Sequence, residues 1–187
     1  MGSPRAFSPA KLVVAVISSR PAGRADVNAR LEALFGPIDF ESPPVDFSFT
    51  DYYDREMGRP LSRWFTAFDR LVGPETLASI KLRTNALEAE LAGGHGRPFN
   101  LDPGLLTLAR FVLATTKESA HRIPLTDGIY ADLTLKYEKG AFRPLPWTYP
   151  DYRSEPYIAL LERIRDRLRE QLGGGKAAHP GGSLPLA

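Results

Sequence analysis

The chain contains no cysteine and no long apolar run. Without thiols it cannot form a disulfide, bind zinc through cysteine or use a cysteine nucleophile. Its longest apolar run, residues 12–17, is far shorter than the roughly 20 residues of a membrane-spanning helix, and no signal-peptide cleavage pattern follows it. These absences predict a soluble protein of the cytoplasm with no membrane partner.

An excess of charge of one sign is also lacking. Lysine and arginine number 24 against 22 aspartates and glutamates, which leaves a formal net charge of +2. This balance excludes a strongly basic nucleic-acid footprint and leaves only a local patch open. At 187 residues the chain is long enough to fold around one core without a metal or a disulfide. We expect a loose leader at residues 1–10, a single domain at residues 11–172 and a disordered tail at residues 173–187.

Hydrophobic periodicity predicts the order of the secondary structure elements. Strands are expected at residues 11–18, 38–49 with a break at Pro43 and Pro44, 61–72, 99–101, 121–125, 129–137 and 141–145, and helices at residues 27–35, 73–92 and 154–172. The two prolines of residues 146–152 predict an extended segment there. Asp127-Gly128 and Lys139-Gly140 predict hairpin turns. This order favours an α+β fold, a ferredoxin-like βαββαβ sandwich with an added β-hairpin and a C-terminal helix.

One segment is ambiguous. Asp102-Pro103-Gly104 has the composition of a turn, in which aspartate bonds its own backbone and proline fixes φ. The apolar residues at 105–113 fit either a buried strand or a short buried helix. The Pro-Gly start favours the helix.

Polar residues gather at the expected ends of these elements, in four segments at 50–58, 100–104, 115–122 and 146–153. We expect a rigid scaffold to bring them around one cleft. The candidate residues are Thr50, Asp51, Tyr52, Tyr53, Glu56, Asn100, Asp102, Lys117, His121, Arg122, Trp147, Thr148, Tyr149, Asp151 and Tyr152. Lys81 and Asn85, four residues apart on the second helix, would face the same way and join them, although such a stripe is usually only solvated.

Three chemistries are open for this cleft. His121 is a candidate acid and base catalyst that Asp102 or Asp51 would orient, with Lys117 and Arg122 as anion binders; its alternative is a hydrogen-bonded structural histidine. A Mg²⁺ or Mn²⁺ site has enough candidate ligands, but no known metal-binding spacing. They are Asp51, Glu56, Asp102, His121, Asp132 and Asp151.

The aromatic residues offer the third chemistry. Tyr52, Tyr53, Trp147, Tyr149 and Tyr152 are candidates to stack on a base or a sugar. Their alternative role is the packed lid of a small core.

Four motifs, at residues 50–58, 100–104, 114–122 and 146–152, carry a resemblance to a known family. In the same order along the chain they resemble the prokaryotic family of the domain of unknown function DUF4416. The family offers no established activity to carry over, although some members bear the label of GTP-binding protein. The Gly-rich segment 173–176 does not support that label, because it follows a predicted helix and precedes Ala177 rather than serine or threonine.

The sequence therefore favours an enzyme that acts on a phosphorylated or nucleotide-like small molecule. The alternatives are a non-catalytic nucleotide or RNA binding module, and a structural protein that uses its last helix as an interface.

Overall fold

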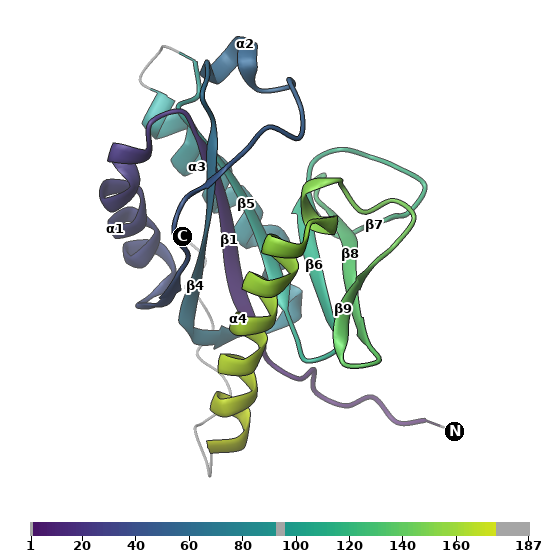
Figure 1. Cartoon of the computed structure of the whole chain (residues 1–187). Coiled ribbons are helices and arrows are strands. Elements are labelled where there is room, and N and C mark those ends of the chain that lie inside the picture. The colour runs from purple at the N-terminus through teal and green to yellow at the C-terminus, as the bar shows by residue number, and fades with distance from the viewer. Residues whose placement is uncertain (1, 93–95, 175–187) are drawn as a thin grey trace.

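The computed structural model describes residues 2–92 and 96–174 (Figure 1). Within these residues nine strands form one open antiparallel sheet in the order β2-β4-β1-β5-β6-β8-β7, with β3 paired to β4 and β9 paired to β8. The strands are β1 (Ala10–Ser18), β2 (Ile38–Glu41), β3 (Val45–Asp46), β4 (Ser62–Val72), β5 (Phe99–Leu106), β6 (Arg110–Thr115), β7 (Arg122–Pro124), β8 (Tyr130–Glu138) and β9 (Ala141–Pro144). The predicted α+β class is confirmed.

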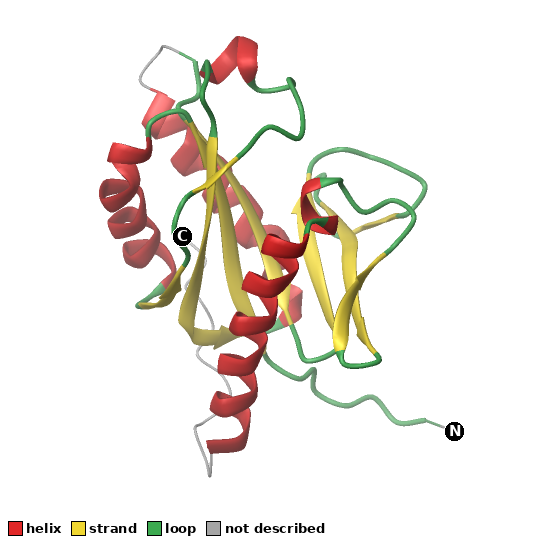
Figure 2. Ribbon diagram, viewed as in Figure 1, coloured by secondary structure: helices red, strands yellow, loops and turns green. Residues whose placement is uncertain are grey.

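Helices cover both faces of the sheet (Figure 2). The four α-helices of the described residues are α1 (Arg24–Phe35), α2 (Asp54–Met57), α3 (Leu77–Ala92) and α4 (Glu155–Gly174), and three short 3₁₀ turns are η1 (Pro21–Gly23), η2 (Pro74–Thr76) and η3 (Asp151–Arg153). α1 and α3 pack on one face, and α4 packs on the other. None of these helices combines the length and the apolar character of a membrane span.

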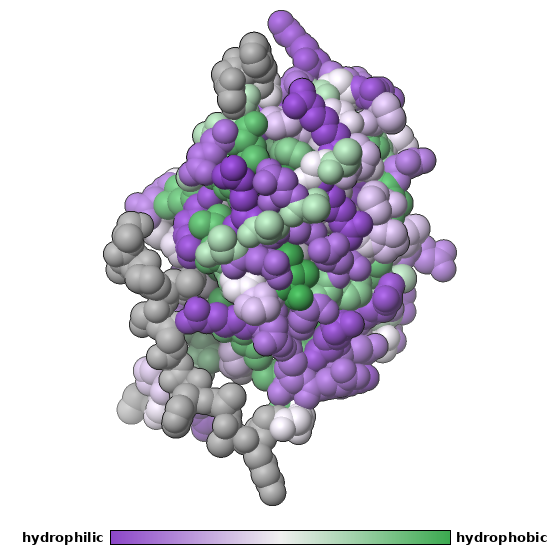
Figure 3. Space-filling model, turned by 90° about the vertical axis from the view of Figure 1, so that its left-hand side faces the viewer, coloured by the Kyte–Doolittle hydropathy of each residue, from purple (hydrophilic) through white to green (hydrophobic). Residues whose placement is uncertain are grey.

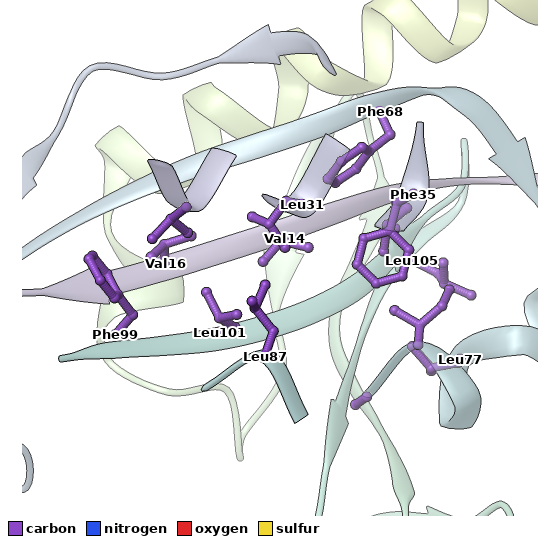
Figure 4. Close-up of a cluster of buried hydrophobic side chains, with 14 of the residues drawn as sticks. Val14, Val16, Leu31, Phe35, Phe68, Leu77, Leu87, Phe99, Leu101 and Leu105 are labelled. Atoms are coloured by element: carbon purple, nitrogen blue, oxygen red, sulfur yellow. The ribbon is translucent and has the colours of Figure 1, made fainter. Parts of the chain in front are cut away.

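β1 lies inside the sheet between β4 and β5, and all of its residues are buried. Val14 and Val16 join the cluster under α1 and α3, which Figure 4 shows, whereas Val13 and Ala15 face α4. A continuous run of β-branched residues suits a strand that is covered on both sides. The exposed residues of α1 are charged residues and alanines, and hydrophilic and hydrophobic residues are intermixed on the side of the molecule that Figure 3 shows.

Two hairpin turns are confirmed. Asp127 and Gly128 have positive φ values of 54° and 73°, and Lys139 and Gly140 have 51° and 80°. Two consecutive residues with positive φ are the mark of the tight turn that matches the twist of antiparallel strands. These turns link β7 to β8 and β8 to β9.

The predicted turn at residues 102–104 and the predicted helix at residues 105–113 are wrong. β5 runs straight through Asp102, Pro103 and Gly104, and the turn to β6 comes at residues 107–109. Gly104 is required by packing rather than by a turn, because a Cβ there would lie 2.7 Å from ring atoms of Phe111. Pro103 is tolerated because β6 begins to pair with β5 only at Gly104.

Three boundaries also differ from the predictions. The segment 146–152, expected to be extended, contains a turn closed by the Thr148 N–H on the Leu145 carbonyl at 3.0 Å, and ends in η3. The expected loop 50–58 includes α2. α4 ends at Gly174, and the rest of the predicted tail, from residue 175, lies outside the described residues.

Substituting Gly104 tests the packing account. We expect Gly104→Ala to lower the free energy of unfolding by about 1–3 kcal/mol, because its methyl group would be forced against Phe111 and the Val112 carbonyl. Urea unfolding followed by circular dichroism measures the change. Gly173→Ala, whose Cβ would meet open space, is the control, and equal losses in the two variants would contradict the account.

Candidate functional site

A cavity of about 660 Å³ opens where β5 and β6 separate. The two strands pair only through Gly104–Leu106 and Phe111–Leu113, so their far ends are free to diverge. Both strands line the cavity, with Asn100 and Asp102 from β5 and Ala114 and Thr115 from β6. α3 contributes side chains from one face of the sheet, and η3 contributes Asp151 and Tyr152. The site is therefore a split in the sheet.

Two side chains of α3 compensate for the missing strand partner of β5. The Lys81 ammonium donates to the Leu101 carbonyl at 2.9 Å, and the Leu101 N–H donates to Glu88 Oε1 at 2.6 Å. Buried backbone groups must find such partners, or they cost free energy. Lys81 lines the cavity, as one of the two interpretations of its sequence position expects, and the alternative of a solvated stripe is wrong for it, because it is 7% exposed and satisfies this strand edge.

Arg63 of β4 is the buried hub of the inner wall. Its side chain is 3% exposed, forms an ion pair with Asp151 and lies 3.6 Å from Asp102 Oδ2. Its guanidinium also lies 4.7 Å from the ring centroid of Phe47 and 5.2 Å from that of Tyr152. Burial alone would lower the pKa of Arg63, but Tyr152 and the two carboxylates raise it above its ordinary value, so the group stays charged.

A second charged group ties α2 to α3. Arg97 donates to Glu88 Oε2 at 2.5 Å and lies 3.2 Å from Glu56 Oε2. Burial raises the pKa of Glu88, and the nearby Lys81 and Arg97 only partly oppose that rise. Tyr53, which lines the cavity beside them, also has a raised pKa because it is buried and faces Asp102. It is therefore a neutral hydroxyl.

Two tyrosines and one lysine, Lys117, form the rim of the cavity. Tyr52 is 60% exposed and Tyr149 is 43% exposed. The Lys117 ammonium lies 4.2 Å from the ring centroid of Tyr52. Among the described residues no carboxylate lies within ion-pair distance of Lys117, in contrast to Arg63, Lys81 and Arg97.

Many of the residues singled out in the sequence line this cavity. They are Thr50, Tyr52, Tyr53, Lys81, Asn85, Asn100, Asp102, Lys117, Tyr149, Asp151 and Tyr152. Arg122 does not line the cavity itself. It contacts two residues that do, because it donates to Asp132 at 2.9 Å and to the Tyr149 hydroxyl at 2.6 Å. Glu56 reaches the cavity only through Arg97.

Other candidates lie outside the lining. The exposed Asp51 makes no side-chain contact among the described residues. Thr148 is 3% exposed, and its hydroxyl joins the Thr134 carbonyl to the Leu145 N–H, which is a structural role. The Trp147 indole donates to the Leu133 carbonyl at 2.9 Å, and its ring stacks on His121 with centroids 5.2 Å apart.

The predicted partners of His121 need correction. Its Nε2 lies 3.5 Å from Asp132 Oδ2, and its Nδ1 lies 3.0 Å from the Ser119 hydroxyl. Neither Asp102 nor Asp51 contacts the ring; Asp102 is instead held by Asn100 at 2.7 Å and by the cations of the inner wall. The turn at residues 119–122 aims the histidine at β8 rather than into the cavity.

The arrangement does not support the expected metal site. Within residues 2–92 and 96–174 no three histidine, aspartate or glutamate side chains gather closely enough to hold a metal ion. Four carboxylates line the cavity, and each lies beside an arginine: Glu88, Asp102, Asp132 and Asp151. They neutralise protein cations instead.

Sequence reasoning missed Arg63, Glu88, Arg97 and, as a partner of His121, Asp132. Arg63 left a usable signal, because it shares the alternating face of Phe65 and Ala67 within a strand that was predicted correctly. A charged residue on a buried face requires a partner. Arg97 left none, since a basic residue after a Gly-rich loop is ordinarily solvated.

Removing Arg63 tests its role as the hub. We expect Arg63→Met to lower the free energy of unfolding by about 3–5 kcal/mol, because Asp151 would remain buried without its counter-charge. Urea unfolding provides the measurement. Arg59→Met is the matched control, since Arg59 is 56% exposed and its pair with Asp54 is expected to contribute at most about 1 kcal/mol. Losses of the same size in both variants would refute this role.

The raised pKa of Glu88 predicts a pH dependence. Just above the ordinary carboxyl pKa of 4.5, the folded chain holds the Glu88 proton that the unfolded chain has released. The free energy of unfolding should therefore fall as the pH rises through this range, and Glu88→Gln should remove that part of the slope. Urea unfolding at a series of pH values tests it against Glu90→Gln, which removes a carboxylate from the same helix. Parallel pH profiles for the wild type and Glu88→Gln would contradict it.

Comparison with known proteins places the chain in a family. A search of the curated proteins and a search of the solved structures found no match. The model of one family, described as Domain of unknown function (DUF4416), matches residues 8–168. This match spans the sheet and almost all of its covering helices. The chain belongs to the DUF4416 family.

Proposed function

We propose that this protein binds a small phosphorylated or nucleotide-like molecule in the split between β5 and β6. The observation that carries the proposal is the combination of a cavity of about 660 Å³, an exposed aromatic rim and Lys117, the lining cation without a carboxylate partner among the described residues. Cavities of roughly 300–1,000 Å³ hold most small ligands. An unpaired ammonium at the mouth favours an anionic group there.

Two exposed aromatic rings and one amide at the cavity support the same proposal. Tyr52 and Tyr149 offer ring faces on which a base or a sugar can stack. Asn85, one helical turn after Lys81, makes no side-chain hydrogen bond among the described residues. Its amide offers both a donor and an acceptor. A ligand with a polar ring and an anionic group would use all of these groups.

Binding is favoured over catalysis by the place of His121. The candidate base lies behind Asp132 and does not line the cavity, although its Nε2 is buried without a hydrogen bond. A general base must reach the proton that it removes, directly or through one water molecule. We therefore propose a binding function and assign no reaction.

A small ligand is also favoured over RNA or a protein partner. Arg122 and Arg153, two basic residues near the exposed aromatic rings, are engaged with Asp132 and with the backbone carbonyls of residues 145, 146 and 148, respectively. The apolar stripe of α4 is buried against the sheet through Leu161, Ile164 and Leu168. Neither surface is open for a large partner.

We also propose that the segment from β1 to β5 is a ferredoxin-like unit. The antiparallel order β2-β4-β1-β5 and the packing of α1 and α3 on one face support it. An experimental structure with β1 at an edge of the sheet would contradict this proposal.

Lys117→Ala tests the binding proposal. Thermal shift assays with nucleoside monophosphates and sugar phosphates should first find a ligand that raises the Tm of the wild type, since a ligand at about 100 times its Kd stabilises by about 2.7 kcal/mol. The variant should then bind that ligand about tenfold to a hundredfold more weakly, because a charged hydrogen bond is lost.

Lys136→Ala serves as the matched control. Lys136 lies in β8 outside the cavity, and its ammonium is 3.0 Å from Glu138 Oε2. The control should bind like the wild type. If Lys117→Ala also binds like the wild type, the anionic end of the ligand does not lie at Lys117, and the proposal fails.

A further inference from the structure

The inner end of the cavity contains three buried hydrogen-bonding atoms without a partner. They are the hydroxyls of Tyr152 and Tyr157 and the Nε of Arg63. The three residues are 2%, 1% and 3% exposed, respectively, so bulk water does not satisfy these atoms. An unpaired buried donor costs about 1–3 kcal/mol. Three such atoms in neighbouring residues favour a bound polar group at this end, either a water molecule or an atom of a ligand.

The three residues are neighbours. The Arg63 guanidinium lies 5.2 Å from the ring centroid of Tyr152 and 5.6 Å from that of Tyr157. The two tyrosine rings are 6.0 Å apart, and Phe65 packs against both of them. Arg63 and Tyr152 line the cavity, with Tyr157 packed behind them. A ligand that fills the split would therefore end at this cluster.

All three groups act as donors at neutral pH. Burial raises the pKa of Tyr157 to about 12 and that of Tyr152 well above its ordinary value, so both phenols keep their protons. The Nε of arginine donates and cannot accept. The Arg63 Nε therefore requires an acceptor, and an acceptor also satisfies the tyrosine hydroxyls, which can donate as well as accept.

The charge balance decides which acceptor fits. Arg63 and Lys81 supply two positive charges at the inner wall, and Asp102 and Asp151 supply two negative ones. A further anion there would be buried beside both carboxylates without a free cation. The rim, in contrast, has Lys117. The structure thus separates a neutral, donor-rich inner end from a cationic mouth.

We propose that the inner end binds an uncharged carbonyl oxygen, such as that of a pyrimidine base, while the phosphate of the same molecule stays at Lys117. This inference rests on the proposed function and specifies the ligand class and its orientation. Tyr152 is the specificity-determining residue, because it belongs to the unpaired cluster and lines the cavity.

Tyr152→Phe tests the inference with two readouts. Without ligand, the variant should have a Tm equal to or above that of the wild type, because it removes a buried hydroxyl that has no partner. With ligand, isothermal titration should show about tenfold weaker binding of uridine monophosphate, while ribose phosphate, which lacks the carbonyl groups, binds as it does to the wild type.

The outcomes separate the two proposals. A Tyr152→Phe chain that binds uridine monophosphate as tightly as the wild type overturns the inference and leaves the proposed function standing. A lower Tm for the unliganded variant overturns it too, because the hydroxyl would then already have a partner such as a buried water. Tyr157→Phe, which leaves the lining of the cavity unchanged, repeats the test without ligand, and its Tm should also equal or exceed that of the wild type. A wild-type chain that binds neither uridine monophosphate nor ribose phosphate overturns both proposals.

Discussion

The buried ion pair between Arg63 and Asp151 is the interaction on which the rest of the site depends. It links β4, which pairs with β1, to η3, which immediately precedes α4. Because α4 begins at Glu155, this pair also places the start of the helix that covers one face of the sheet. A buried pair of this kind adds little net stability, since desolvation of both charges offsets their attraction. Its effect is to favour one arrangement of the chain around the cavity.

Where β5 and β6 separate, backbone groups of β5 lose their strand partner, and side chains of α3 satisfy them. A strand edge inside a protein leaves backbone N–H and C=O groups without partners. Pro103 carries no N–H group, and Lys81 and Glu88 satisfy both backbone groups of Leu101. Because these side chains are occupied with the backbone, they form the wall of the cavity. Asn85 and Lys117, which have no hydrogen bond or ion pair from their side chains within the described part of the chain, are among the polar groups that a ligand can reach. Structural and binding roles are thus divided among neighbouring residues.

Local patterns predicted those parts of the fold that depend on local chemistry. The β-branched run of β1, the periodic apolar residues of α3 and the two tight turns with glycine are each specified within a few residues. The same approach failed at Asp102-Pro103-Gly104, where turn composition has a different cause. There the aspartate faces two cations, the proline marks the point where the strands part, and the glycine admits the ring of Phe111.

The sequence by itself determined the α+β class, the strand β1, the family resemblance and the segments whose side chains gather at one cavity. Only the tertiary structure decided which charges meet. His121 pairs with Asp132 rather than with Asp102, and Arg63, hidden in an apolar strand, holds Asp151 from a position 88 residues away. The physical reason is the separation along the chain of the residues that interact. Periodicity and turn chemistry act between neighbours in the chain, whereas ion pairing and strand separation depend on distances in space that no local pattern contains.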